Sequence, residues 1–161
     1  MNIKIGILGY GNIGRGVETA LRDNPDMELA AVFTRRDPSQ VKILSENVPV
    51  ISVSEIEAWK DKIDVLLLCG GSATDLPQQT PFYAKMFNVV DTFDTHAKVP
   101  AHFAAVDRSA KENGKIARVF KGAFKVEGAL ISSINRNAEW ALNTLARLEQ
   151  TAERRPSVLE A

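Results

Sequence analysis

The residues best suited to chemistry are three glycines near the start of the chain, Gly9, Gly11 and Gly14, spaced as GxGxxG. Such a turn brings backbone N–H groups to a pyrophosphate. The first glycine permits the tight turn, the second lets the backbone approach the phosphates, and the third lets the following helix pack closely. A helix that begins there adds the positive end of its dipole. The pattern is common by itself, so its meaning depends on a strand before it and a helix after it.

The flanking segments supply that context. Residues 2–8 (NIKIGIL) form a short run rich in β-branched residues, which predicts a buried strand. Residues 13–23 repeat apolar side chains at the helical period, and Asn24-Pro25 follows as a stop signal. We therefore expect the turn to bind a dinucleotide, the alternative being a tight turn between strand and helix without a ligand. Its residues are Gly9, Tyr10, Gly11, Asn12, Ile13 and Gly14.

The end of the second predicted strand, residues 29–33, indicates which dinucleotide is bound. An NAD site usually places Asp or Glu there, where it accepts hydrogen bonds from the ribose 2′-hydroxyl. This chain has Thr34, Arg35 and Arg36 instead, followed by Asp37. A guanidinium can hold a 2′-phosphate through paired charge-assisted hydrogen bonds. The sequence therefore favours NADP(H), with NAD(H) binding more weakly; the alternative is a solvated basic turn.

Strands and helices continue to alternate along the chain, with short connections. This alternation is typical of an α/β protein, and we expect a three-layer, doubly wound parallel sheet of the Rossmann type. Residues 63–69 are the most apolar strand, as a strand buried on both faces should be. We expect further strands at residues 50–53, 88–93 and 115–120, and helices from a capping box at residues 54–57, at residues 80–87 and at residues 99–114.

The character of the sequence changes after residue 117. Residues 118–127 are basic and fit neither a strand nor a turn well, whereas residues 129–154 repeat apolar side chains at spacings of three and four. We expect a long amphipathic C-terminal helix there, ended by Pro156, within a single domain of residues 1–161. This helix could pack on the sheet of its own chain. It could equally mediate self-association between copies of the chain, as could surface that the loss of a second domain would leave exposed.

Composition excludes several classes of function. The formal net charge is zero, so no basic excess points to nucleic acid. The longest apolar run, residues 65–69, is too short to cross a bilayer, and we expect a cytoplasmic protein without a membrane partner. Cys69 is the only cysteine, which excludes an internal disulfide and a cysteine-based zinc site. We expect no metal site.

Four strings together resemble one family, the meso-diaminopimelate D-dehydrogenases. They are GYGNIGRGVE, PDMELAAVFTRR, DVLLLCGGSATDLP and VVDTFDTHAKVP, at residues 9–18, 25–36, 64–77 and 89–100. Members are NADP-dependent oxidoreductases that deaminate the D-centre of meso-diaminopimelate. The resemblance extends over residues 3–117 and implies the same nucleotide-binding domain here.

The resemblance also implies roles for individual residues. Tyr10–Ile13 and Thr34–Arg36 would hold the adenine-side phosphates. Asp94 would contact the reacting amino acid centre, and it is our one candidate catalytic residue. From the residues alone, we expect Asp75 to cap a helix, Asp91 to form hydrogen bonds at a strand end, and His102 to be an ordinary helix-face residue. The residues implied along the ribose, pyrophosphate and nicotinamide are Cys69, Gly70, Gly71, Ser72, Thr92, Phe93 and His96.

The chain departs from the family in two respects. Members carry a second domain that binds diaminopimelate, for which this chain has no room. They also have a Gly-Trp-Asp-Pro-Gly motif where this chain reads KGAFK, residues 121–125. We therefore expect an NADP(H)-binding Rossmann domain, excised or rebuilt, without full catalysis. The alternatives are an oxidoreductase that retains NADP-dependent deamination of an amino acid, and an engineered scaffold that binds no cofactor.

Overall fold

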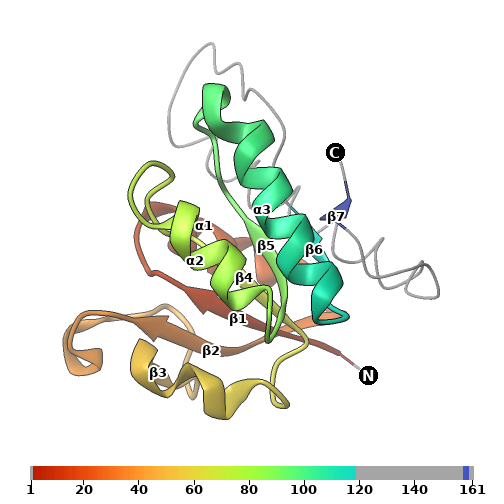
Figure 1. Cartoon of the computed structure of the whole chain (residues 1–161). Coiled ribbons are helices and arrows are strands. Elements are labelled where there is room, and N and C mark those ends of the chain that lie inside the picture. Colours follow the sequence, from red (N-terminus) through yellow and green to blue (C-terminus); the bar gives the residue numbers. More distant parts are fainter. Residues whose placement is uncertain (1, 119–157, 160–161) are drawn as a thin grey trace.

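The computed structural model of the protein describes residues 2–118 and 158–159 (Figure 1). The predicted C-terminal helix at residues 129–154 lies outside the described residues. In the part of the chain that is described, no helix is long and apolar enough to cross a membrane.

A parallel sheet forms the centre of the molecule. Its strand order is β3-β2-β1-β4-β5-β6-β7, and every pairing is parallel. The first six strands follow the Rossmann order, which reverses direction between β1 and β4, and β7 extends the β6 edge. The predicted fold class is confirmed. The strands are β1 (Ile3–Leu8), β2 (Met27–Thr34), β3 (Val50–Ser52), β4 (Val65–Leu68), β5 (Asn88–Asp91), β6 (Ala117–Arg118) and β7 (Val158–Leu159).

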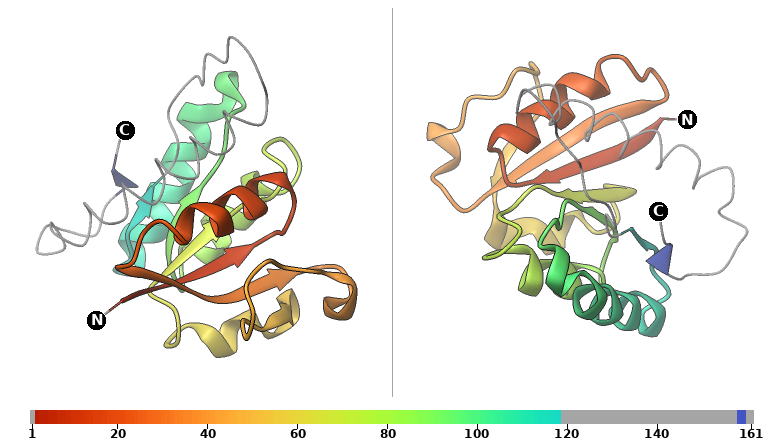
Figure 2. Two further views of the ribbon diagram at one scale, coloured as in Figure 1. Left: turned by 180° about the vertical axis from the view of Figure 1, so that it is seen from behind. Right: turned by 90° about the horizontal axis from the view of Figure 1, so that it is seen from above.

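Helices cover both faces of the sheet, which gives three layers (Figure 2). On one face, α1 packs Val17 and Leu21 against Ile7 and Leu67 of the strands. The other face carries η2, α2 and α3. The helices are α1 (Asn12–Leu21), α2 (Leu76–Tyr83) and α3 (Val99–Glu112), with short 3₁₀ segments η1 (Pro38–Gln40), η2 (Val53–Trp59) and η3 (His96–Lys98).

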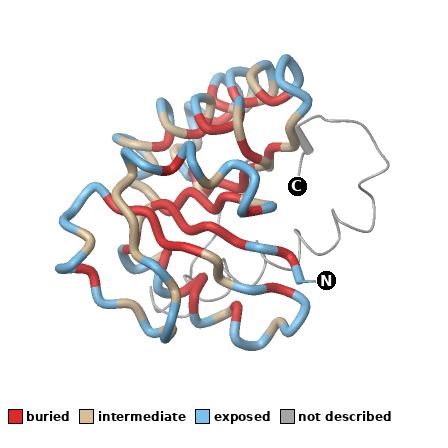
Figure 3. Tube along the Cα trace, turned by 90° about the horizontal axis from the view of Figure 1, so that it is seen from below, coloured by how far each residue is buried: buried red, intermediate tan, exposed pale blue. Residues whose placement is uncertain are grey.

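The strand β4 shows why its sequence is so uniformly apolar. Leu66 and Leu68 belong to the core beneath α2 and α3, whereas Leu67 belongs to the core beneath α1. Successive side chains of a strand point to opposite faces, so a central strand needs apolar residues at every position. Figure 3 shows buried residues, in red, along the strands in the interior of the molecule.

The helix predicted at residues 80–87 is wrong in its position. It spans Leu76–Tyr83, with Pro77 in its first turn and Pro81 inside it. The chain is already wound before Thr80, because the N–H groups of Asp75 and Leu76 donate to the Gly71 carbonyl at 2.8 and 3.1 Å. Thr80 is therefore a buried helical residue and not a cap.

The capping box predicted at residues 54–57 is also wrong. The strand β3 ends at Ser52, and the 3₁₀ segment η2 begins directly after it, so Ser52 takes the N-cap position. Its Oγ accepts from the N–H of Ser54 at 3.4 Å. By contrast, Gly114 closes α3 as predicted, with φ at +62° and its N–H on the Lys111 carbonyl.

Candidate functional site

The glycine turn after β1 has the geometry that its sequence predicted. Gly9 adopts a φ of +94°, a conformation that favours glycine. A Cβ at Gly14 would lie 2.4 Å from the Gly9 carbonyl oxygen, so only glycine lets α1 begin this close to the turn. A Cβ at Gly11 would meet nothing within 4 Å. The backbone at Gly11 therefore faces open space, as a phosphate-binding turn requires.

A pocket of about 370 Å³ opens beside this turn. Three of its lining residues are cations, and none is an acid. Sequence reasoning found Arg36 but missed Arg15 and Lys42. Arg15 directly follows the last glycine of the motif, and that position in the first turn of α1 could have indicated it. The lining residues are Tyr10, Gly11, Asn12, Arg15, Arg36, Gln40, Val41 and Lys42.

Arg36 is held in place at the pocket by two contacts. Its guanidinium donates to the Tyr10 carbonyl at 2.8 Å. Its backbone N–H donates to Oγ1 of the buried Thr34 at 3.0 Å. Thr34 therefore stabilises the backbone of the turn after β2, and Arg36 contributes a positive charge to the pocket. Asp37 does not line the pocket. Its carboxylate caps η1 by accepting from the N–H and hydroxyl of Ser39 at 2.9 and 2.8 Å.

Arg35 is placed differently from Arg36, although the two are neighbours in sequence. Its guanidinium forms a bidentate ion pair with Asp75, at 2.9 and 3.0 Å. The Asp75 carboxylate also accepts from the Gly71 N–H at 3.0 Å. This hydrogen bond, together with the Arg35 charge, lowers the pKa of Asp75 against the effect of burial. Arg35 thus joins the end of β2 to the loop after β4.

The prediction that Asp75 caps a helix is wrong. Asp75 occupies the N-cap position of α2, but its side chain makes no capping hydrogen bond. Its backbone is in the helical region, with φ at −102° and ψ at −54°, whereas a capping residue is usually extended. The carboxylate is turned back toward Gly71 and holds the Gly70–Gly71 loop instead.

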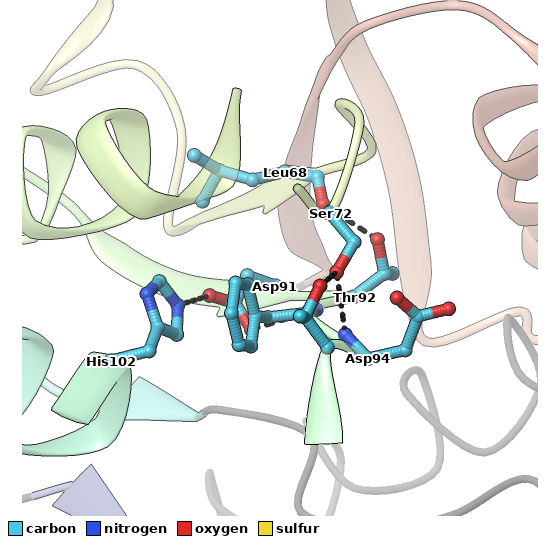
Figure 4. A network of polar contacts seen from close by, with 8 residues as sticks. Leu68, Ser72, Asp91, Thr92, Asp94 and His102 are labelled. Atoms are coloured by element: carbon cyan, nitrogen blue, oxygen red, sulfur yellow. Dashed lines mark hydrogen bonds and ion pairs between the residues drawn. The ribbon is translucent and has the colours of Figure 1, made fainter. Parts of the chain in front are cut away.

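The loops after β4 and β5 are joined by a polar network (Figure 4). The hydroxyl of Ser72 accepts from the Asp94 N–H at 2.8 Å and contacts the Thr95 hydroxyl at 3.0 Å. The Thr92 hydroxyl donates to the Leu68 carbonyl at 3.4 Å. The network fixes the backbone of Asp94, whose exposed carboxylate points away from the pair formed by Asp91 and His102.

His102 is a buried partner of Asp91, so its expected role as an ordinary helix-face residue is wrong. Its Nε2 lies 2.6 Å from the Asp91 carboxylate, and the two side chains are 3% and 0% exposed. The ring stacks on Phe93 with centroids 4.0 Å apart. Asp91 also accepts from the Phe93 N–H at 3.3 Å, which confirms its predicted role at a strand end.

Three other implied residues lie near this edge. The Phe93 side chain is buried in the core and does not face this edge of the sheet. Cys69 is also buried, and burial raises the pKa of its thiol to about 12, which makes it a packing residue and not a nucleophile. Its carbonyl lies beneath Gly9. His96 begins η3. No cluster of metal-ligating side chains occurs in the described residues.

Substituting Gly11 with alanine should separate binding from folding. Because a methyl group there meets no atom of the protein, we expect an unchanged melting temperature. The methyl would occupy the space over the turn, and we expect NADPH and NADH to bind about tenfold more weakly, an effect of about 1.4 kcal/mol. Thermal unfolding and nucleotide titration check the two halves. Unchanged affinity for both nucleotides would contradict the placement of phosphate at Gly11.

Comparison with known proteins extends the sequence resemblance. The chain is 58% identical over 120 residues to meso-diaminopimelate D-dehydrogenase of Ureibacillus thermosphaericus, covering 74% of this chain and 36% of that protein. It is 40% identical over 121 residues to the Corynebacterium glutamicum enzyme, covering 75% and 36%. The chain thus spans about a third of the length of these curated relatives.

Solved structures give the same result. An engineered D-amino acid dehydrogenase bound to NADP⁺ is 40% identical with a TM-score of 0.68, covering 76% of this chain and 37% of that one. A meso-diaminopimelate dehydrogenase variant from Clostridium tetani, bound to diaminopimelate, is 43% identical with a TM-score of 0.67, covering 92% and 42%. Residues 103–161 match the model of a family of unknown function, DUF6674. The resemblance stated from the sequence is confirmed.

Proposed function

We propose that this chain, which is similar over about three-quarters of its length to meso-diaminopimelate D-dehydrogenases, is an NADP(H)-binding domain. One observation carries the proposal: the pocket beside the glycine turn gathers three cations and no acid. A 2′-phosphate needs positive charge and hydrogen-bond donors, and a carboxylate lining the pocket would repel it.

The described residues suit each part of the cofactor. The pyrophosphate would lie over Gly11, at the N-terminus of α1, where backbone N–H groups are free to donate. The 2′-phosphate would lie among Arg15, Arg36 and Lys42. The nicotinamide, which accepts or donates hydride when bound, would lie toward the loops after β4 and β5, because ligands of open α/β sheets bind at the carboxyl ends of the strands.

Binding without turnover is the expected behaviour of the 161-residue chain alone. Catalysis requires groups on both sides of the reacting carbon. Among the described residues, Asp94 is the one group that the family resemblance implies for contact with the amino acid, and it is exposed. Retained deamination of a D-amino acid centre is the second candidate, favoured by the relatives' names.

A competition titration tests the proposed function. NADPH fluorescence should change saturably on addition of the full chain, and adenosine 2′,5′-bisphosphate should reverse the change at lower concentration than 5′-AMP. Absence of any saturable change at millimolar NADPH would contradict the proposal. In parallel, meso-diaminopimelate and NADP⁺ are mixed with the chain while the absorbance of reduced nicotinamide is followed. We expect no rate above the protein-free control, and a clear rate would favour the enzymatic alternative.

A further inference from the structure

A buried acid on α1, Glu18, is hydrogen-bonded to Tyr10 of the cation-lined pocket and to the segment that follows Lys42. Glu18 is 1% exposed, although it carries a carboxylate on a helix face that is otherwise apolar. It lies four residues after Gly14, so it faces the same side of α1 as the glycine turn. Burying a carboxylate is costly unless hydrogen bonds satisfy it. Its partners therefore indicate why it is there.

All the hydrogen-bond donors to Glu18 come from the segments that line the pocket or follow its lining. The Tyr10 hydroxyl donates to Oε2 of Glu18. The backbone N–H groups of Leu44 and Ser45 donate to Oε1 at 3.0 and 2.6 Å. Tyr10 lines the pocket directly, and Leu44 and Ser45 follow, after Ile43, the lining residues Gln40, Val41 and Lys42.

The segment of residues 41–45 is fixed by packing on the core as well as by its hydrogen bonds to Glu18. Val41 packs in the core beneath α1, Ile43 packs against the same core, and Arg22, the C-cap residue of α1, donates to the Leu44 carbonyl at 3.0 Å. The Leu44 side chain itself is 49% exposed. Lys42, one of the three pocket cations, lies between Val41 and Ile43, and the hydrogen bonds that Glu18 accepts two and three residues further on fix the end of its segment.

Tyr10 transmits the same constraint to the other cations. Its hydroxyl is bound to Glu18, while its carbonyl accepts from the Arg36 guanidinium at 2.8 Å. Arg15, which also lines the pocket, acts to lower the pKa of Tyr10 against the effects of burial and Glu18. Glu18 thus fixes Tyr10, whose carbonyl binds Arg36. It also accepts hydrogen bonds from the segment that follows Lys42.

We propose that Glu18 is a specificity-determining positioning residue, which fixes Tyr10 and residues 41–45 so that the three pocket cations converge on a 2′-phosphate. The inference rests on the proposed NADP(H) binding and extends it to a residue that does not line the pocket. A residue that served folding alone would affect every nucleotide equally. Glu18 is expected to affect those that carry a 2′-phosphate.

The protonation states of the pair agree with this arrangement. Burial and the neighbouring Glu18 raise the pKa of Tyr10 to about 12, so its hydroxyl keeps its proton. Burial alone would raise the pKa of Glu18, but the hydrogen bonds from Tyr10, Ser45 and Leu44 outweigh it and lower the pKa. Because the pKa of Glu18 is lowered, the contribution of Glu18 to stability is present at neutral pH and is lost on acidification. Because the pKa of Tyr10 is raised, the contribution of Tyr10 is lost as the pH approaches 12.

Glu18→Gln and Tyr10→Phe test the inference, with Glu28→Gln as the control. Glutamine cannot accept from all three donors, because its amide nitrogen is itself a donor. For Glu18→Gln we expect the NADPH dissociation constant to rise about tenfold and that of NADH to change less than about twofold. Tyr10→Phe removes one hydrogen bond but keeps the ring, so a smaller change in the same direction is expected. Glu28 is an exposed acid on β2, and its variant should match the wild type.

The outcomes distinguish the inference from the proposed function. If the wild-type chain binds neither nucleotide, both fail. If it prefers NADPH and both variants keep that preference unchanged, only the role of Glu18 is overturned. Should Glu18→Gln fail to fold, Tyr10→Phe and amide hydrogen exchange of the wild type decide. Adenosine 2′,5′-bisphosphate should slow exchange at Leu44 and Ser45 more than 5′-AMP does, and equal protection by both would overturn the inference.

Discussion

Replacing Arg36 with alanine is expected to weaken NADPH binding by about tenfold to a hundredfold, while NADH binding changes by about twofold or less. A hydrogen bond to a charged group contributes about 1.5–3 kcal/mol, and each 1.4 kcal/mol is a factor of ten in affinity. NADH has no 2′-phosphate for the guanidinium to bind. Titration of both nucleotides against variant and wild type at one salt concentration measures the two ratios.

Arg35→Ala is the matched control for this result. The neighbouring guanidinium pairs with Asp75 and does not line the pocket. The Arg35 side chain is 65% accessible and Asp75 is 16% accessible, so solvent screens the ion pair and a stability change of about 1 kcal/mol or less is expected. We expect Arg35→Ala to alter NADPH and NADH affinity by similar, small factors. If Arg35→Ala reduced NADPH binding selectively and Arg36→Ala did not, the assignment of the two arginines would be reversed.

Replacing Asp91 with alanine is expected to destabilise the fold by about 2–6 kcal/mol, because each buried donor left without an acceptor costs about 1–3 kcal/mol. Two groups lose their acceptor at once, the buried His102 ring and the Phe93 N–H. This loss is a large part of the stability of a small domain, which is about 5–15 kcal/mol in total. Chemical denaturation of variant and wild type gives the difference.

Two related variants show whether the loss comes from the hydrogen bonds of the Asp91 carboxylate. Asp91→Asn keeps a carbonyl oxygen as an acceptor and should lose less stability than the alanine variant. Asp94→Ala changes an exposed acid three residues away and should alter the free energy of unfolding by less than about 0.5 kcal/mol. Equal destabilisation by all three variants would contradict the role given to the buried pair.

The sequence predicted most of what local pattern determines. The glycine turn, the apolar strands and the alternation of strands and helices follow from turn chemistry and side-chain period, and the fold class is confirmed. The helix α2 was misplaced because Thr80-Pro81 has the chemistry of a helix start. The earlier turn at Gly71–Asp75 fixes the start instead, through hydrogen bonds that no local pattern reveals.

The sequence predicted the site residues that are close together along the chain, but not the contacts between distant segments. Arg35 and Arg36 look equivalent in sequence, yet their contacts differ. Arg35 pairs with Asp75, whereas Arg36 donates to the Tyr10 carbonyl at the pocket. The pairing of Asp91 with His102, and of Glu18 with residues 44–45, joins elements that are distant in sequence. Such partners are chosen by packing. A buried acid on an apolar helix face was the one sequence signal that could have pointed to Glu18.

The most direct test of NADP(H) binding is calorimetric titration of the full wild-type chain with NADPH and, separately, with NADH. The three pocket cations predict saturable binding of one NADPH per chain, with a dissociation constant at least about tenfold lower than that of NADH. The preference should shrink as salt rises, since charge attraction to the 2′-phosphate is screened. Equal affinity for the two nucleotides, or tighter binding of NADH, would contradict the account.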